Sequence, residues 1–340
     1  MKKYLTDAHS ALGYINLQQD NLVGVDTVFY LSRCHDNLAD FILVHLAQSL
    51  EQEGYTCERV YSASNLSRLS AVILRDKGIG FVSGVEAPLD AIVIDFSSAY
   101  GSANDPIIAA LRQEMDAHYQ DMYAHLYRAL RIHDDWEHIY IENMDFKKAN
   151  QFKANLIKDK FNAPAKPVPG LIMRRFFGGV TPTRYMDFVD DISRGLKRYF
   201  IKGRAGTGKS TLMRGIADYT SAQGYDTELY HCGFDPNSID MVLIPELGVC
   251  IFDATLPHEY DPSEPTDEVI DTYVAYIKEG TDETYQGEIA IIAHKYKDAI
   301  ADGVTCLGKA AALREEINQL YDQVLDMDVA LRLFSECMRV

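Results

Sequence analysis

The chain has 340 residues, of which 47% are hydrophobic and 24% are charged, and its net charge is −17. This composition is that of a folded protein long enough for two domains, and it excludes disorder on a large scale. The acidic balance disfavours nonspecific nucleic-acid binding, and no apolar run is long enough to span a membrane. With scattered cysteines and no apolar segment behind the N-terminus, the chain is expected to be cytoplasmic.

The first half, residues 1–160, begins with an α/β pattern and ends in helix. Residues 30–61 read as strand, turn, helix, a stop at Gly54-Tyr55 and a second strand. Residues 109–140 carry apolar side chains at spacings of three and four, which is typical of a long amphipathic helix. We expect this helical segment to form a hairpin that packs on the α/β core of its own half.

Residues 161–170 (FNAPAKPVPG) contain three prolines and end in glycine. Proline resists both helix and sheet, so this segment is predicted to be a stiff linker. It divides the chain into a domain of residues 1–160 and a domain of residues 171–340.

The second half repeats the pattern of the first. Gly224-Tyr225 corresponds to Gly54-Tyr55, and Glu228 corresponds to Glu58, at a constant offset. The apolar runs at 198–202, 227–232 and 249–253 are short and β-rich without alternation, as in strands buried on both faces of a parallel sheet. A second helical segment follows at 285–321. The sequence therefore predicts two tandem α/β domains, each with a helical C-terminal extension.

A phosphate-loop pattern, GRAGTGKS, lies between the first of these strands and a helix expected at 210–221. Glycines allow the backbone to approach phosphates closely, and successive N–H groups converge on an anion at the start of the helix. A lysine adds a full charge, and a hydroxyl can reach magnesium. The predicted nucleotide-binding residues are Gly203, Arg204, Ala205, Gly206, Thr207, Gly208, Lys209, Ser210 and Thr211.

The predicted magnesium ligands are Ser210 and Asp253, because Asp253 ends the buried run at 249–253. Several carboxylates are candidates for the residue that activates a water or a substrate. Asp235 and Asp240 follow the second strand, and Glu246 precedes the third. Catalytic roles are assigned to Lys209, Asp253, Asp235 and Glu246, although Asp235 suits a turn equally well. His258 is expected to be structural, and His231 with Cys232 lacks a second ligand pair for zinc.

The first half has no such pattern. Residues 33–41 (RCHDNLADF) contain neither glycine nor lysine, and Asp36 and Asp40 would repel a triphosphate. Ser83 stands where the second half has Asp253. The first half is therefore predicted to be a degenerate copy that kept the fold and lost the nucleotide.

The blocks at 172–265 resemble an uncharacterised family of tandem P-loop ATPases from Firmicutes. The resemblance rests on FFGGVTPTRYMDFVDDI, YFIKGRAGTGKSTLMRGIA and the run from YHCGFDPNSID to DATLPHEYDP, in that order. It implies a P-loop nucleoside-triphosphatase fold, ATP with Mg²⁺, and site residues Lys209, Ser210, Thr211 and Asp253. The family usually has a glycine-rich loop in both halves and Asp-Gly-Thr where this chain has Asp-Ala-Thr from Asp253.

Three functions are compatible with one working site. The first is a Mg²⁺-dependent ATPase that acts as a switch, with the first half and the helical tails relaying the nucleotide state to a protein partner. The second is a kinase that transfers the γ-phosphate to a small molecule or nucleotide, with residues 256–290 as a substrate lid. The third is a non-catalytic interaction protein that ATP stabilises.

Overall fold

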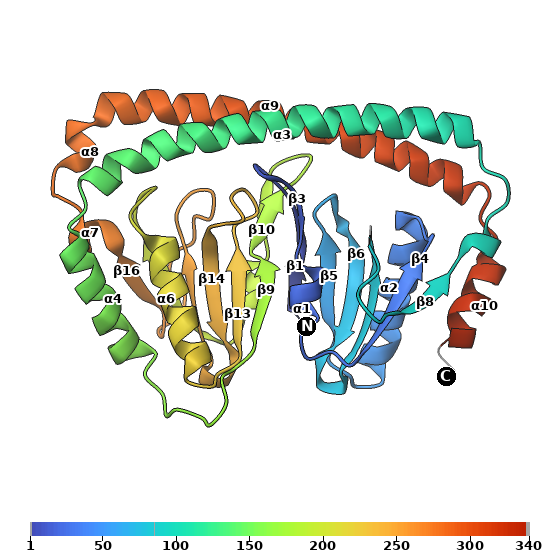
Figure 1. The fold of residues 1–340 in the computed structure, drawn as a ribbon, viewed down its shortest axis with the longest axis horizontal. Helices are drawn as coiled ribbons and strands as arrows, with labels where there is room; N and C mark the ends of the chain where they lie inside the picture. Colours follow the sequence, from blue (N-terminus) through green and yellow to red (C-terminus); the bar gives the residue numbers. More distant parts are fainter. Residues whose placement is uncertain (1, 85, 338–340) are drawn as a thin grey trace.

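The computed structural model describes residues 2–84 and 86–337. They form an α/β protein in which one large sheet is flanked by helices and two long helices run above both ends of it (Figure 1). Within this described part, twelve strands form the sheet in the order β16-β12-β15-β14-β13-β9-β1-β5-β6-β7-β4-β8. The first half of the chain forms one side of the sheet and the second half forms the other.

The strands are β1 (Lys2–Leu5), β2 (Asp7–Ser10), β3 (Gly13–Asn16), β4 (Thr27–Ser32), β5 (Glu58–Ser62), β6 (Asn65–Leu74), β7 (Ile79–Ser83), β8 (Ile92–Asp95), β9 (Ile172–Phe176), β10 (Gly178–Val180), β11 (Tyr185–Asp187), β12 (Lys197–Lys202), β13 (Thr227–His231), β14 (Ile239–Ile244), β15 (Val249–Asp253) and β16 (Glu268–Asp271). The helices are α1 (Gln18–Asn21), α2 (Asp36–Gln52), α3 (Asp105–Glu142), α4 (Phe146–Lys160), α5 (Val189–Ile192), α6 (Lys209–Ala222), α7 (Thr272–Tyr276), α8 (Thr281–Thr284), α9 (Gln286–Asp322) and α10 (Met327–Cys337), with the 3₁₀ turns η1 (Arg75–Lys77), η2 (Ser97–Ala99) and η3 (Pro245–Leu247).

The strand pairings confirm the duplication. Thr27 pairs with Ile79, and 170 residues later Lys197 pairs with Val249. Both halves also show the same irregularity in pairing, after Val60 in β5 and after Tyr230 in β13. The two halves meet where β1 and β9 run antiparallel at the centre of the sheet.

The sheet is mixed, and this corrects the expectation of purely parallel strands. The three predicted strands of the second half correspond to β12, β13 and β15, and their residues are mostly buried. Between β13 and β15 lies β14, which is antiparallel to both. The seven residues from Cys232 to Ser238 that join β13 to β14 are too few for the crossover that a parallel connection needs. In the first half, β6 likewise lies between β5 and β7 and is antiparallel to both.

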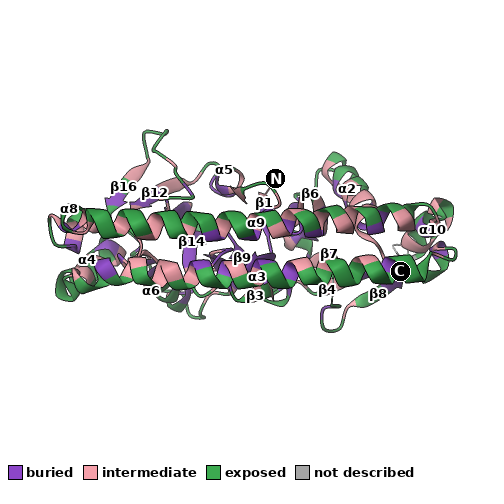
Figure 2. Cartoon of the chain, turned by 90° about the horizontal axis from the view of Figure 1, so that it is seen from above, coloured by how far each residue is buried: buried purple, intermediate pink, exposed green. Residues whose placement is uncertain are grey.

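Two long helices, α3 and α9, lie side by side along both halves, and the face seen from above is largely exposed (Figure 2). With 38 residues, α3 is about 57 Å long. The sheet is about 53 Å across its eleven interstrand spacings. Each helix therefore carries the chain from one half to the far side of the other.

Because of this crossing, the expected packing of each helical hairpin on its own core is wrong. The helix α4 follows α3 and packs on α6 and α7 of the second half, whereas α10 follows α9 and packs on β8 and η2 of the first. Equivalent isolated bridges hold the chain at the two ends of the pair of long helices. Met144 forms an isolated bridge with Ile277, and Leu325 forms one with Tyr100. Thus α4, which ends at Lys160, lies with the second half, and α10 lies with the first.

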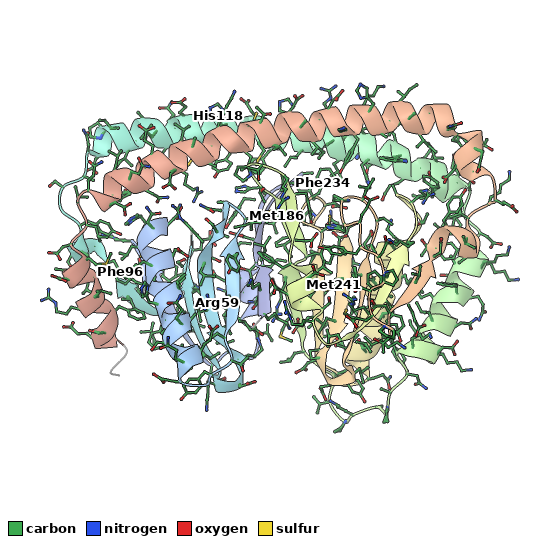
Figure 3. The ribbon with its side chains drawn as sticks, turned by 180° about the vertical axis from the view of Figure 1, so that it is seen from behind. Arg59, Phe96, His118, Met186, Phe234 and Met241 are labelled. Carbon is green, nitrogen blue, oxygen red and sulfur yellow. The ribbon has the colours of Figure 1, made fainter. Side chains whose placement is uncertain are left out.

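The halves share one core on one face of the sheet. It includes Tyr4 and Val60 from the first half and Phe200, Met241 and Phe252 from the second. Separate clusters pack α4 and α6 against the second half and α2 and α10 against the first. Figure 3 shows Met241 within the sheet and Phe234 nearer the long helices, with which Phe234 packs.

A buried charge cluster joins the two halves at the centre of the sheet. Arg175 is fully buried and lies 2.8 Å from Glu228 of its own half and 3.3 Å from Glu58 of the other. Lys2 binds Glu228 and Arg75 binds Glu58. Burial opposes ionisation of both glutamates, but these cations hold their pKa values below the ordinary range.

The linker at 161–170 has no helix or strand and lies against the second half. Lys166 N–H donates to the Gln223 carbonyl, and Gly170 N–H donates to that of Ser221. Among the described helices, none combines the length and the apolar character that crossing a membrane requires.

Candidate functional site

The predicted glycine loop, residues 203–210, joins the carboxyl end of β12 to the start of α6. Gly206 and Gly208 have φ angles of 73° and 75°, in the left-handed region that favours glycine, and Gly208 is the N-cap of α6. A Cβ atom on Gly203 would lie 2.2 Å from the Thr272 hydroxyl. The glycines of the motif are therefore required by backbone conformation and by close packing.

Lys209 reaches back across the loop. Its ammonium donates to the Arg204 carbonyl at 2.8 Å and lies 3.5 Å from a carboxylate oxygen of Asp253. The strands β12 and β15 are parallel neighbours, with Ile201 paired to Asp253, so the loop and this carboxylate lie at the same edge of the sheet. The structure thus brings together the lysine and the aspartate that the sequence selected.

Ser210 and Asp240 lie near the same end of β14. The Ser210 hydroxyl accepts a hydrogen bond from the Ile239 N–H at 2.9 Å, which places the first turn of α6 against the start of β14. Asp240 is the residue at which the pairing of β14 with β13 shifts, since Tyr230 pairs with Met241 and His231 with Ile239. The Asp253 carboxylate therefore lies beside the Lys209 ammonium, whereas Asp240 lies toward His258.

Helices from both halves support the outer side of the loop. A Cβ on Gly206 would lie 2.5 Å from the carbonyl oxygen of Glu137, so the end of α3 touches the loop backbone. Tyr276 of α7 donates its hydroxyl hydrogen bond to the Thr207 carbonyl at 2.8 Å. Arg204 turns away from the loop toward Asp282 of α8, at 2.8 Å. Only α3 among these elements begins in the first half.

The contact between Glu137 of α3 and Gly206 of the loop makes Gly206→Ala a destabilising substitution. We expect it to lower the free energy of unfolding by about 2 to 5 kcal/mol, since left-handed strain costs about 1 to 2 kcal/mol and overpacking about 1 to 3 kcal/mol. Gly248→Ala is the matched control, because Gly248 has φ 65° and open space around its Cβ position. Urea denaturation of both variants measures the difference. Equal losses would show that α3 does not press on the loop.

A buried histidine lies behind the two carboxylates. His258 is 3% exposed, with Nδ1 3.2 Å from Asp187 and Nε2 3.6 Å from Asp240. Burial opposes its protonation, but the two carboxylates outweigh this and raise the pKa of His258 to about 9. Asp240 Oδ2 and Tyr185 Oη are buried without a hydrogen-bond partner. The Asp240 oxygen without a hydrogen bond, Oδ2, is the one that faces His258, so a cationic His258 compensates its charge.

The raised pKa gives a stability that depends on pH. The native state binds the proton more tightly than the unfolded state, whose histidine pKa is about 6.5. The stabilisation is therefore complete below pH 6.5 and is lost as the pH rises through about 9. We expect His258→Gln to cost on the order of 3 kcal/mol at pH 6 and much less at pH 9.5. Urea denaturation at the two pH values tests this, and a cost independent of pH would contradict it.

Two predicted catalytic residues do not fit the site. Glu246 lies in η3, before β15, whereas Asp253 ends that strand, so the two are at opposite edges of the sheet. Glu246 pairs there with Lys166 at 2.5 Å, away from the glycine loop. Asp235 accepts the Asn237 N–H at 3.1 Å, which is the role of a turn residue. Thr255, by contrast, donates its hydroxyl hydrogen bond to Asp253 at 2.6 Å.

In the first half, the corresponding loop is closed by hydrogen bonds and an ion pair between its side chains and the helix α9. His35 Nε2 lies 2.7 Å from Asp322 at the end of α9, and the Asn37 amide donates to the same carboxylate at 2.6 Å. Asp36, at the start of α2, pairs with Arg314 at 3.3 Å. Carboxylates of the protein thus lie where a helix N-terminus would attract an anion.

Comparisons with protein families, with curated proteins and with solved structures returned no match. A search of the described residues for three or more histidine, cysteine, aspartate or glutamate side chains placed to hold a metal found none.

Proposed function

We propose that residues 203–211 bind a nucleoside triphosphate, with ATP as the expected nucleotide. The observation that carries this proposal is the position of the Lys209 ammonium, held between the loop carbonyl of Arg204 and Asp253. Around it, the left-handed glycines and the start of α6 provide backbone N–H groups at the positive end of a helix. A triphosphate would replace Arg204 and Asp253 as the partner of this ammonium.

The side chains beside Lys209 suit magnesium. Ser210, Asp253 and Asp240 offer the oxygen donors that this cation prefers, and two direct protein ligands are enough because Mg²⁺ retains waters and phosphate oxygens. Bound there, the ion would neutralise charge on the phosphates. We assign Ser210 and Asp253 as the direct ligands.

We propose hydrolysis as the reaction, with Asp240 as the general base. A water oxygen attacks the γ-phosphorus, the bond from that phosphorus to the β–γ bridging oxygen breaks, and the proton of the water passes to Asp240. The products are ADP and inorganic phosphate. Asp240 is favoured over Asp235 because it lies near the start of β14, next to the strand β15 that ends in Asp253, whereas Asp235 caps a turn.

The contact between α3 and the loop supports a switch. Closure of the loop on phosphates would act on the backbone at Gly206 and therefore on the end of α3. The middle of the same helix contacts the first half through Tyr123, which lies 2.9 Å from His9. A change at the nucleotide would thus be passed between the halves by a single helix, and a protein partner could bind either half.

The contacts of the proposed lid do not favour the kinase alternative. Its proposed lid, residues 256–290, is tied to the core by Asp261, which pairs with Lys202 at 3.0 Å, and by Asp267, which pairs with Arg198 at 2.5 Å. Residues 286–290 already belong to α9.

Incubation with Mg²⁺ and ATP, without any acceptor, separates the three functions. We expect the protein to release ADP, and Lys209→Ala to reduce release at least tenfold, because hydrogen bonds to a charged group contribute about 1.5 to 3 kcal/mol each. ADP release that requires an added metabolite would indicate a kinase. ATP binding without turnover would indicate the non-catalytic function.

A further inference from the structure

A cavity of about 390 Å³ lies in the first half at the place that corresponds to the proposed nucleotide site. Ser62, Ser70 and Ser83 line it, and each precedes by 170 residues a residue of the second half: Cys232, Asp240 and Asp253. Tyr119 and Tyr123 of α3 and Arg314 of α9 complete the wall from the side of the long helices. The first half has therefore kept a space where the second half has its acidic cluster.

The cavity wall is polar and firmly built. Asp7 and His9 are each less than 9% exposed. Asp7 accepts the Ala63 N–H at 2.8 Å and the Tyr14 hydroxyl at 2.9 Å. His9 lies between the Ser64 hydroxyl, at 3.0 Å, and that of Tyr123, and its ring stacks on Tyr119. Burial, together with the charge of Arg314, lowers the pKa of His9 to about 3, so this ring is neutral at physiological pH.

The charges of the wall are largely compensated within the protein. Arg68 pairs with Glu315 at 2.7 Å, and Arg314 pairs with Asp36 at 3.3 Å. Asp36 also stands at the start of α2, where it opposes an incoming anion. A highly charged ligand such as a triphosphate is therefore disfavoured. The groups of the wall that can bind a ligand are neutral hydroxyl and amide groups and the Arg314 Nε. This nitrogen is buried without a hydrogen-bond partner.

We propose that this cavity binds an uncharged, hydroxyl-rich molecule of monosaccharide size. Its volume is that of about a dozen water molecules, each occupying about 30 Å³. Hydroxyl groups of a ligand both donate and accept, as do the serine, asparagine and glutamine side chains of the wall. The rings of Tyr119 and Tyr123 offer apolar edges and faces for the carbon skeleton. The inference is independent of the proposed nucleotide site.

Saturation-transfer NMR of the full chain with D-glucose, D-ribose and myo-inositol, and with inorganic phosphate and glucose 6-phosphate as charged comparators, tests the proposal. We expect at least one neutral probe to bind at millimolar concentration, without competition from phosphate. Ser70→Leu should weaken that binding at least fivefold by filling the cavity. The Ser70 hydroxyl donates a long hydrogen bond, 3.4 Å to the Val60 carbonyl, so the loss of this hydroxyl should be tolerated.

Ser49→Leu is the matched control, because Ser49 is exposed on α2 and does not line the cavity. It should leave binding unchanged. Ser83→Leu serves as a second filling variant if circular dichroism shows that Ser70→Leu is unfolded. The proposal is overturned if no neutral probe binds, if only the charged probes bind, or if binding persists in the folded filling variants.

Discussion

Replacing Arg175 with methionine will lower the free energy of unfolding by about 3 to 5 kcal/mol, the range found when one partner of a buried ion pair is removed. The guanidinium is fully buried and pairs with a glutamate from each half. Its loss leaves Glu58 and Glu228 close together, with only Arg75 and Lys2 to compensate them. Urea denaturation at pH 7 measures the effect.

Arg174→Met is the matched control, because Arg174 precedes Arg175 in β9 and its guanidinium makes a hydrogen bond with the His231 ring. Arg174 is half-buried, so we expect this variant to cost about 1 kcal/mol, the usual contribution of one hydrogen bond. The pKa values of Glu58 and Glu228 lie below normal in the native state, so their stabilisation is present above about pH 4.3 and is lost as the pH falls. Equal costs for the two variants would contradict a central role for Arg175.

Replacing Asp240 with asparagine will lower ATP hydrolysis by about two to four orders of magnitude, the usual contribution of a general base. The amide is nearly isosteric, so the packing against His258 remains, but it accepts no proton. Binding of ATP should change little, because the loop and Lys209 are intact. Single-turnover ADP release and equilibrium binding, measured on the same variant, separate the two effects.

Asp235→Asn is the control for this prediction. Asparagine can accept the Asn237 N–H in the same turn, so hydrolysis should stay near the wild-type rate. If Asp235→Asn abolishes hydrolysis and Asp240→Asn does not, the assignment of the base is wrong while the nucleotide site stands. If neither variant matters although ATP is hydrolysed, the water is activated by another group.

The sequence predicted the parts of the molecule that local rules determine. Glycine and lysine spacing identified the loop at 203–210, and the buried run before Asp253 placed that carboxylate at the same edge of the sheet. The repeat predicted equivalent turns, and Gly54 and Gly224 both have φ 91°. The long apolar periodicities at 109–140 and 285–321 correspond to α3 and α9.

Features that depend on contacts distant in sequence were not predictable. Amphipathic spacing predicts that α3 is a helix. It does not predict that the helix is long enough to cross the sheet and place its residue Glu137 against Gly206 of the loop. Arg175 follows another arginine and reads as an exposed charge until Glu58 is brought to it from the other half. Asp240 was one carboxylate among several, and its place near the start of β14, 3.6 Å from His258, distinguishes it.

The stoichiometry of Mg²⁺-ATP binding tests the central claim most directly. Equilibrium binding to the purified full chain should give one nucleotide per chain, since the first-half loop is closed by Asp36 and Asp322. Lys209→Ala should reduce the affinity at least tenfold. Two nucleotides per chain, or an affinity unchanged in Lys209→Ala, would contradict a single site at the glycine loop.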